Sequence, residues 1–272
     1  MKNKKNTRIG KVLLIMTSVV LVAAISVYGT LAFLTATTQE LTNSFQSSTG
    51  ISGKVDEPSF PGGRTGGSTS YEFGTPVPKD PLIQNTGTND MFVGLKLDFY
   101  LNAQDDTDAN FVKVPYTTFA KYVTIKGDAP NTGAFNTTYW HEETPSNVTD
   151  SKIFTYRPGS GDFTRVTASN GDLSLPSAGS ALPSTAYTAG TDNTYPIFNS
   201  VQISNDVNKA KGVTFNHPTS AVDFAAGPAG LNFEVLNFKI VVTGHGVQAD
   251  GATDNATILS DIMGGLDPAP AP

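Results

Sequence analysis

The strongest constraint on the fold is a long alternation of apolar and other residues over positions 91–101. One side of this run carries Met91, Val93, Leu95, Leu97, Phe99 and Leu101. A period of two over that length predicts a β-strand with one buried face. Residues 231–247 have the same texture, and their apolar phase changes at Val235 and Leu236. That change predicts a β-bulge or a strand that passes from one sheet to another.

The rest of the chain predicts an all-β fold. Short runs rich in Val, Ile, Phe, Tyr and Thr alternate with clusters of Gly, Pro, Asn, Asp and Ser, which is typical of a β-sandwich or barrel. Weaker strands are expected at residues 112–116, 122–126, 152–156, 163–168, 195–203 and 213–215. The simplest architecture is a single jelly-roll-type β-sandwich with long loops, after a cleavable N-terminal signal helix.

One short helix is expected near the C-terminus. Thr253 or Asp254 can cap its start, and an apolar face follows at Ile258, Leu259, Ile262 and Met263. The pair Gly264 and Gly265 is expected to end it.

Composition excludes several kinds of protein. The chain has no cysteine, which removes disulfides, cysteine zinc sites and thiol nucleophiles. Its 18 Lys and Arg against 24 Asp and Glu give a net charge of −6, so binding to nucleic acid is not expected.

The chain also lacks the common catalytic and metal-binding motifs. Its three histidines, His141, His217 and His245, do not form an H-E-x-x-H motif, and isolated surface or strand-end histidines are expected. The acidic loops at 105–108 and 250–254 lack the spacing of a calcium loop. We therefore predict that the protein is not an enzyme and has no catalytic residue, no metal and no cofactor.

The N-terminus is typical of an export signal. A basic, acid-free stretch is followed by an uncharged apolar run over residues 12–28 and by small residues at Thr30 and Ala32. This order predicts cleavage by a signal peptidase between Ala32 and Phe33. The alternative is an uncleaved anchor, since the apolar run is near the lower limit for spanning a bilayer. We expect a protein that is secreted to the extracellular matrix or the cell surface and that contacts the membrane only through an uncleaved signal segment.

The boundaries follow from these segments. We expect a signal peptide at 1–32, a donor-strand-like segment at 33–57, a flexible Gly/Ser/Pro stretch at 58–70, the β-sandwich at 71–265 and a Pro/Ala tail at 266–272.

Two motifs resemble a known family. The string from Gly29 to Thr35, followed by Asn43 and Phe45, resembles the processing junction of proteins cut by the SipW type of signal peptidase. The second motif resembles a signature of the same group, the TasA and camelysin-like family of secreted proteins, many of which form biofilm matrix fibres. Its residues here are Lys79, Asp80, Pro81, Asn85, Gly87 and Asp90. The residues themselves predict an extended entry at Pro81 and a turn at Gly87.

The resemblance implies a secreted structural subunit that polymerises head to tail. Its N-terminal strand would leave its own subunit and add to a sheet of the next copy. The candidate donor is the segment 33–45, which has no Gly or Pro and a single charge, Glu40. One face of it carries Phe33, Thr35, Thr37, Gln39, Leu41, Asn43 and Phe45. The expected partners are other copies of the chain, with signal peptidase during export.

Two other functions are left open. One is a monomeric cell-surface adhesin or sugar-binding jelly roll, and the other is a camelysin-like metallopeptidase. Removal of residues 1–32, which carry five of the 18 basic residues and no acid, leaves 13 basic against 24 acidic residues, a net charge of −11. Subunits with that charge repel each other at low salt, so fibre assembly is expected to improve as ionic strength rises or pH falls.

Overall fold

The computed structural model describes most of the chain from Ile51 to Asp267. The described residues are 51–61, 74–103, 108–127, 133–144, 150–168, 192–204, 207, 219–228, 236–252 and 254–267. The signal segment, the candidate donor strand 33–45, the strand expected at 213–215 and the change of phase at Val235 lie outside them.

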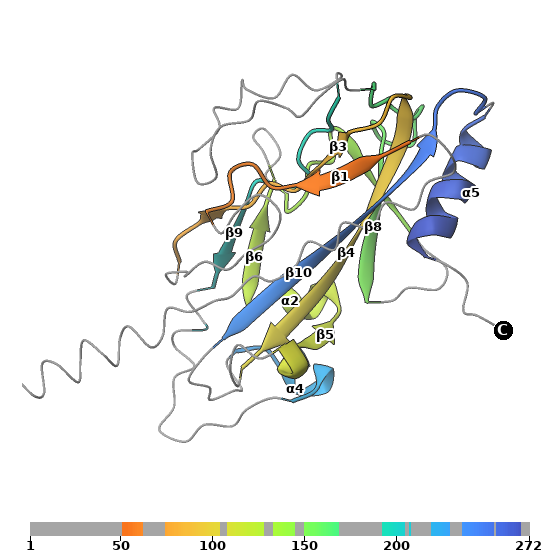
Figure 1. Ribbon diagram of the computed structural model, residues 1–272. Helices are drawn as coiled ribbons and strands as arrows, with labels where there is room; N and C mark the ends of the chain where they lie inside the picture. The colour runs from red at the N-terminus through yellow and green to blue at the C-terminus, as the bar shows by residue number, and fades with distance from the viewer. Residues whose placement is uncertain are drawn as a thin grey trace, which may run out of the picture.

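The described chain is mostly antiparallel β-structure, which confirms the predicted class, and one sheet curls strongly enough to form half a barrel. The largest sheet has the order β10-β4-β8-β7, with β5 also paired to β4. These strands are β4 (Met91–Asn102), β5 (Val112–Val114), β7 (Trp140–Glu143), β8 (Ser151–Tyr156) and β10 (Asn237–Gln248). Figure 1 shows the two longest, β4 and β10, running side by side through the centre of the molecule.

The other described strands form two smaller sheets. One has the order β2-β9-β6 and contains β2 (Val77–Pro78), β6 (Val123–Lys126) and β9 (Ser200–Ile203). The other pairs β1 (Gly53–Asp56) with β3 (Leu82–Asn85). The short helical elements are η1 (Asp108–Asn110), α2 (Tyr116–Phe119) and α4 (Ala221–Ala225).

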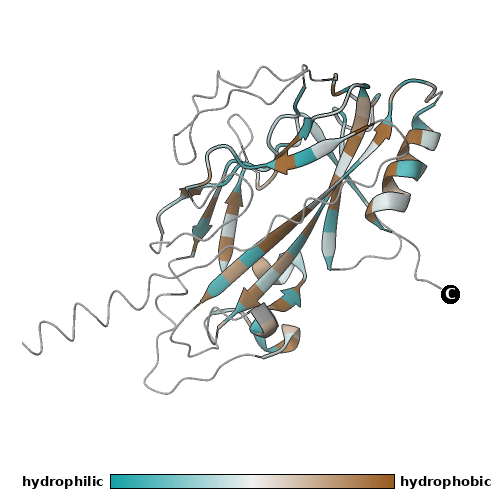
Figure 2. Ribbon diagram, in the orientation of Figure 1, coloured by the Kyte–Doolittle hydropathy of each residue, from teal (hydrophilic) through white to brown (hydrophobic). Residues whose placement is uncertain are grey.

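The alternating run forms a β-strand, as its pattern predicts, and this strand, β4, lies in the interior of the largest sheet. All six residues of the apolar face, from Met91 to Leu101, are fully buried. They pack in one core with residues of the β2-β9-β6 sheet such as Val123 and Val201. Figure 2 shows the hydrophobic and hydrophilic positions alternating along the long strands.

Some predicted strands are shorter than expected or absent. The run 112–116 ends at Val114, because Pro115 starts α2. Only Ser200–Ile203 of the run 195–203 is a strand. The run 163–168 forms a single bridge, between Val166 and Met91. β7 was not predicted, since Trp140–Glu143 carries three consecutive polar residues and has little alternation to detect.

The C-terminal helix α5 (Asn255–Leu266) starts where predicted and ends later. The Asp254 side chain caps it by accepting a hydrogen bond from the Thr257 backbone N–H. The prediction that Gly264 and Gly265 end the helix was wrong, because both lie inside it. Gly265 instead allows α5 to pack closely against His245 of β10, since a Cβ atom there would lie 2.3 Å from the His245 ring.

Helix α5 covers the outer face of the large sheet with a second apolar cluster, which includes Phe92, Ile153 and Ile262. Gly94 of β4 lies beneath it, since a Cβ atom there would be 2.5 Å from Ile262. Among the described residues, no helix is long and apolar enough to cross a membrane.

Candidate functional site: the N-terminal clamp

Four signature residues, Lys79, Asp80, Asn85 and Gly87, contact the segment Ile51–Phe60, the first part of the chain that the structure describes. Strand β1 in this segment pairs antiparallel with β3, and Val55 lies opposite Ile83. We call the residues that hold this segment the N-terminal clamp: Lys79, Asp80, Asn85, Thr86 and Gly87.

A buried ion pair forms one end of the clamp. Lys79 Nζ lies 2.6 Å from Glu57 Oε1 and donates a hydrogen bond to Oε2 at 2.7 Å. Both side chains are almost completely buried. The ammonium group also lies 4.4 Å from the centre of the Phe60 ring, which adds a cation–π contact. Next to it, Asp80 Oδ1 accepts the Ser59 backbone N–H at 2.9 Å.

Burial raises the pKa of Glu57 above its ordinary value, and the nearby Lys79 opposes that rise. Oε1 accepts no well-aligned hydrogen bond despite its closeness to Nζ. The carboxylate therefore depends on Lys79 for compensation, since an unpaired buried charge is strongly unfavourable.

The other end of the clamp is made of backbone contacts. The Thr86 backbone N–H donates to the Ser52 carbonyl at 2.9 Å. Asn85 Oδ1 accepts the Gly87 N–H at 2.9 Å and so fixes the turn that the sequence predicts. Gly87 lies so close to the segment that a Cβ atom would come within 2.7 Å of the Ser52 backbone nitrogen.

The remaining signature residues tie the clamp to the rest of the fold. Pro81 accepts the Ile197 N–H at 3.0 Å through its carbonyl. Asp90 Oδ1 accepts the Ala168 N–H at 2.9 Å, and its carbonyl accepts the Ala249 N–H just after β10. Four of the six signature residues thus contact the segment Ile51–Phe60, and the other two, Pro81 and Asp90, contact other parts of the fold. Glu57 and Ser52, the partners of Lys79 and Gly87, were missed because neither lies in a pattern that marks a contact.

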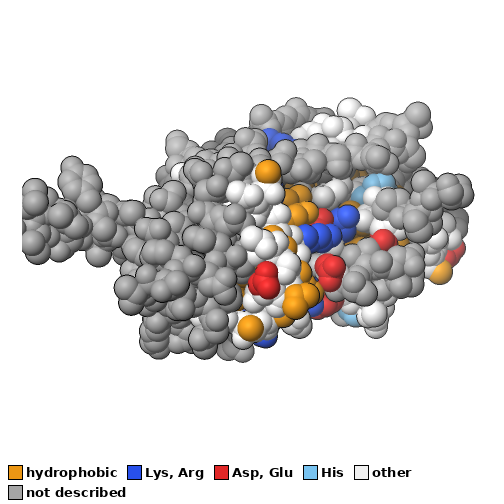
Figure 3. Space-filling model, turned by 90° about the horizontal axis from the view of Figure 1, so that it is seen from below, with side chains coloured by type: hydrophobic (Ala, Val, Ile, Leu, Met, Phe, Trp, Pro, Cys, Tyr) orange, Lys and Arg blue, Asp and Glu red, His pale blue; other side chains and the backbone are white. Residues whose placement is uncertain are grey.

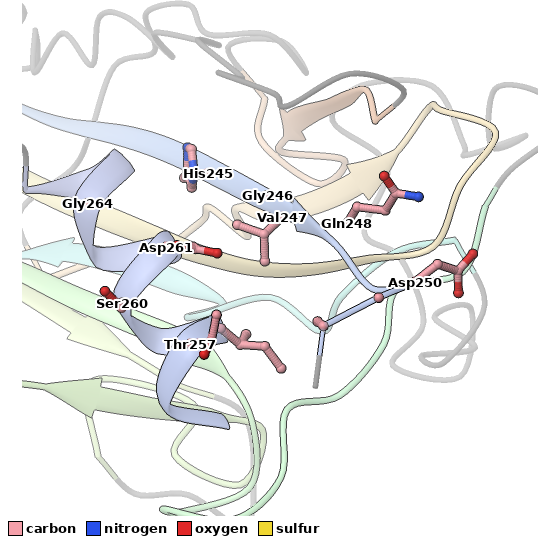
Figure 4. A pocket seen from close by; sticks show the side chains of 12 residues that line it. His245, Gly246, Val247, Gln248, Asp250, Thr257, Ser260, Asp261 and Gly264 are labelled. Carbon is pink, nitrogen blue, oxygen red and sulfur yellow. The ribbon is translucent and has the colours of Figure 1, made fainter. Parts of the chain in front are cut away.

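A pocket of about 560 Å³ lies elsewhere, between the end of β10 and α5 (Figure 4). His245, Val247 and Gln248 line it from β10, and Thr257 and Asp261 line it from α5. Burial lowers the pKa of His245, while Asp261 acts in the opposite direction. Among the described residues, no group of three or more His, Asp or Glu side chains could hold a metal ion.

The surface seen from below carries basic, acidic and hydrophobic side chains close together (Figure 3). His141 and Trp140 lie on β7, where Trp140 is buried and donates its indole N–H to the Tyr195 carbonyl at 2.9 Å. Ala32, Phe33 and the other donor-strand residues lie outside the described part of the chain.

The fold and clamp define a mostly β, antiparallel protein in which the segment Ile51–Phe60 is held by strand pairing and a buried ion pair. No protein-family model, curated protein or solved structure matches the chain. The family resemblance therefore rests on the two sequence motifs.

Proposed function

We propose that this protein is a secreted structural subunit that joins other copies of itself into extracellular fibres by donating its N-terminal strand, residues 33–45. The observation that carries the proposal is the N-terminal clamp. The signature motif holds the segment Ile51–Phe60, which begins only a few residues after the candidate donor strand in the sequence.

A donor strand that holds two subunits together must be firmly attached to the core of its own subunit. If it pairs with the next subunit, any force along the fibre passes through residues 46–50 into the segment Ile51–Phe60. In that segment, β1 pairs with β3, Ser52 lies against Gly87, and Glu57 forms a buried ion pair with Lys79. Such an anchor transmits force to the core without release of the chain.

The wider architecture is compatible with a jelly-roll-type sandwich, which we propose as the complete fold. The β2-β9-β6 sheet and the β10-β4-β8-β7 sheet bury side chains in one common core. A sandwich requires two sheets that bury their inner faces in one core, and this shared core supports the proposal.

Export to the cell surface or matrix completes the proposal. Signal peptidase would release residues 33–45 from the basic, apolar segment before them, and assembly would then begin. The proposal assigns the chain no catalytic role and no cofactor.

Electron microscopy tests the proposal directly. Chains that begin at Phe33 and at Gln46 are compared at equal concentrations, with size-exclusion chromatography on both. The longer chain is expected to form fibres and the shorter one to stay monomeric. Monomers in both samples would contradict the proposal and favour the adhesin alternative.

A further inference from the structure

Over residues 240–248, one edge of strand β10 has no strand paired to it in the described part of the chain. The strand pairs with β4 over its whole length, from Asn237 opposite Asn102 to Gln248 opposite Met91, without a bulge. No described strand pairs with its other edge. The stretch 240–248 therefore presents backbone groups that a further strand can bind.

This edge lacks the features that protect other edges from pairing. Proteins usually guard exposed edges with charged residues, proline, bulges or very short strands. Residues 240–248, IVVTGHGVQ, contain no Lys, Arg, Asp, Glu or Pro. Most other outer strands of the described sheets carry such a residue: Lys54 and Asp56 in β1, Pro78 in β2, Lys113 in β5, Lys126 in β6, and Glu142 and Glu143 in β7. Strand β3 carries none, but it has only four residues and its Ile83 carbonyl accepts the Thr194 N–H. The one charged residue of β10 itself, Lys239, lies just before the stretch 240–248.

The occupant that best fits this edge is residues 33–45. This segment has no Gly or Pro and carries a single charge, Glu40, so it can pair along an uncharged edge. It is long enough, since nine residues of β-strand span about 30 Å and thirteen span about 43 Å. The segment that follows it lies close to β10, because β1 contacts that strand and Ile51 is buried in the main core.

The pocket beside α5 adds room for side chains at one end of the edge. It is bounded by His245 and Val247 of β10 and by Thr257 and Asp261 of α5. Figure 4 shows it next to the end of the strand. A strand longer than the edge would extend past it, and its terminal aromatic residue, Phe33 or Phe45, would lie near this space.

We propose that the open edge of β10, residues 240–248, is the acceptor for residues 33–45 of a second copy of the chain. The inference rests on the proposed function and specifies which surface the donor strand binds. Pairing in trans leaves each subunit with one free donor and one free acceptor, so the contact repeats and the fibre grows.

Cross-linking of the processed chain, residues 33–272, tests this contact. The chain has no cysteine, so engineered cysteines react without background. Thr243→Cys is combined in turn with Thr35→Cys, Thr37→Cys or Leu41→Cys, and assembled samples are treated with a short bismaleimide. The matched control replaces Thr243→Cys by Thr124→Cys, which lies on the outer strand β6.

A ladder of cross-linked multimers is expected with Thr243→Cys and not with Thr124→Cys. An intramolecular cross-link would overturn the choice of a second copy. Fibres without a cross-link to Thr243→Cys would overturn the acceptor edge while leaving the proposed function standing. Absence of fibres in every sample, the chain without substitutions included, would overturn both.

A second variant does not depend on the register of the pairing. Thr243→Lys adds a charge to the edge and is expected to raise the protein concentration needed for assembly about tenfold. Thr124→Lys is expected to leave it unchanged. Thermal unfolding of both variants checks that the fold is intact, and equal assembly of two folded variants would overturn the proposal.

Discussion

A side chain at Gly87 would collide with the backbone of Ser52: a Cβ atom would lie 2.7 Å from the Ser52 nitrogen. Because the obstacle is backbone, it cannot rotate away as the end of a side chain can. The closeness also places the Thr86 N–H against the Ser52 carbonyl. Gly87 therefore allows the segment Ile51–Phe60 to pack closely against the loop after β3.

Gly87→Ala is expected to loosen the segment around Ser52 and to destabilise the fold by about 1–3 kcal/mol, as overpacking usually does. Limited proteolysis is expected to cut the variant near residues 46–52 faster than the original chain. Gly133→Ala is the control, since the nearest atom would be 3.9 Å from its Cβ. Equal rates of cutting in the two variants would contradict the close contact at Ser52.

Lys79→Met removes the partner of a buried carboxylate. The change is expected to cost about 3–5 kcal/mol near neutral pH, because Glu57 is left charged and buried. Adding Glu57→Gln to the same chain removes the charge and is expected to recover part of the loss. Denaturant unfolding of the single and double variants measures both effects, and no recovery in the double variant would count against this account.

The same variant has a defined pH dependence. Burial raises the pKa of Glu57, and the nearby Lys79 acts in the opposite direction and lowers it. Without Lys79 the folded state binds a proton more readily than the unfolded state. The stability of Lys79→Met should therefore increase as the pH falls toward the ordinary carboxyl pKa, relative to the original chain. A constant difference between the two proteins over that range would contradict the burial of a charged Glu57.

Two adjacent glycines of α5 are expected to respond in opposite ways. Gly265→Ala places a methyl group against the His245 ring and should destabilise the docked helix by about 1–3 kcal/mol. Gly264→Ala meets open space and should stabilise the helix by up to about 1 kcal/mol, since alanine has the higher helix propensity. Thermal unfolding separates the two, and loss of stability in both would show that the packing is different.

The docking of α5 is also expected to depend on pH through His245. Burial lowers its pKa in the folded state, so the undocked state binds protons more readily. Docking should weaken as the pH falls below the ordinary histidine pKa of about 6.5. Hydrogen exchange of the α5 amides at two pH values measures this, and His245→Gln should remove the dependence. The same pH response in His245→Gln would assign it to another group.

The long strands were predictable because their side chains alternate without interruption. The burial of Leu95, Leu97 and Phe99 follows directly from that pattern. The helix α5 was predictable at its start, where Asp254 provides a local cap, and not at its end. The role of Gly265 depends on His245, which is distant in the sequence and is brought close only by the fold.

The clamp shows the same limit. The turn at Gly87 could be predicted from Asn85 and the glycine itself, because both act locally. The pairing of Lys79 with Glu57 joins two residues that are separated by an undescribed stretch of chain, and no sequence period links them. β7 was missed for a related reason, since its polar residues are held by cross-strand pairing with β8.

The most direct test of strand donation is the binding of a labelled peptide, residues 33–45, to the chain that begins at Gln46. Fluorescence anisotropy should show saturable binding of one peptide per chain, and a scrambled peptide of the same composition should not compete. The complex should remain a monomer, because its subunits have lost their own donor strands. Absence of saturable binding, or equal binding of the scrambled peptide, would contradict the account.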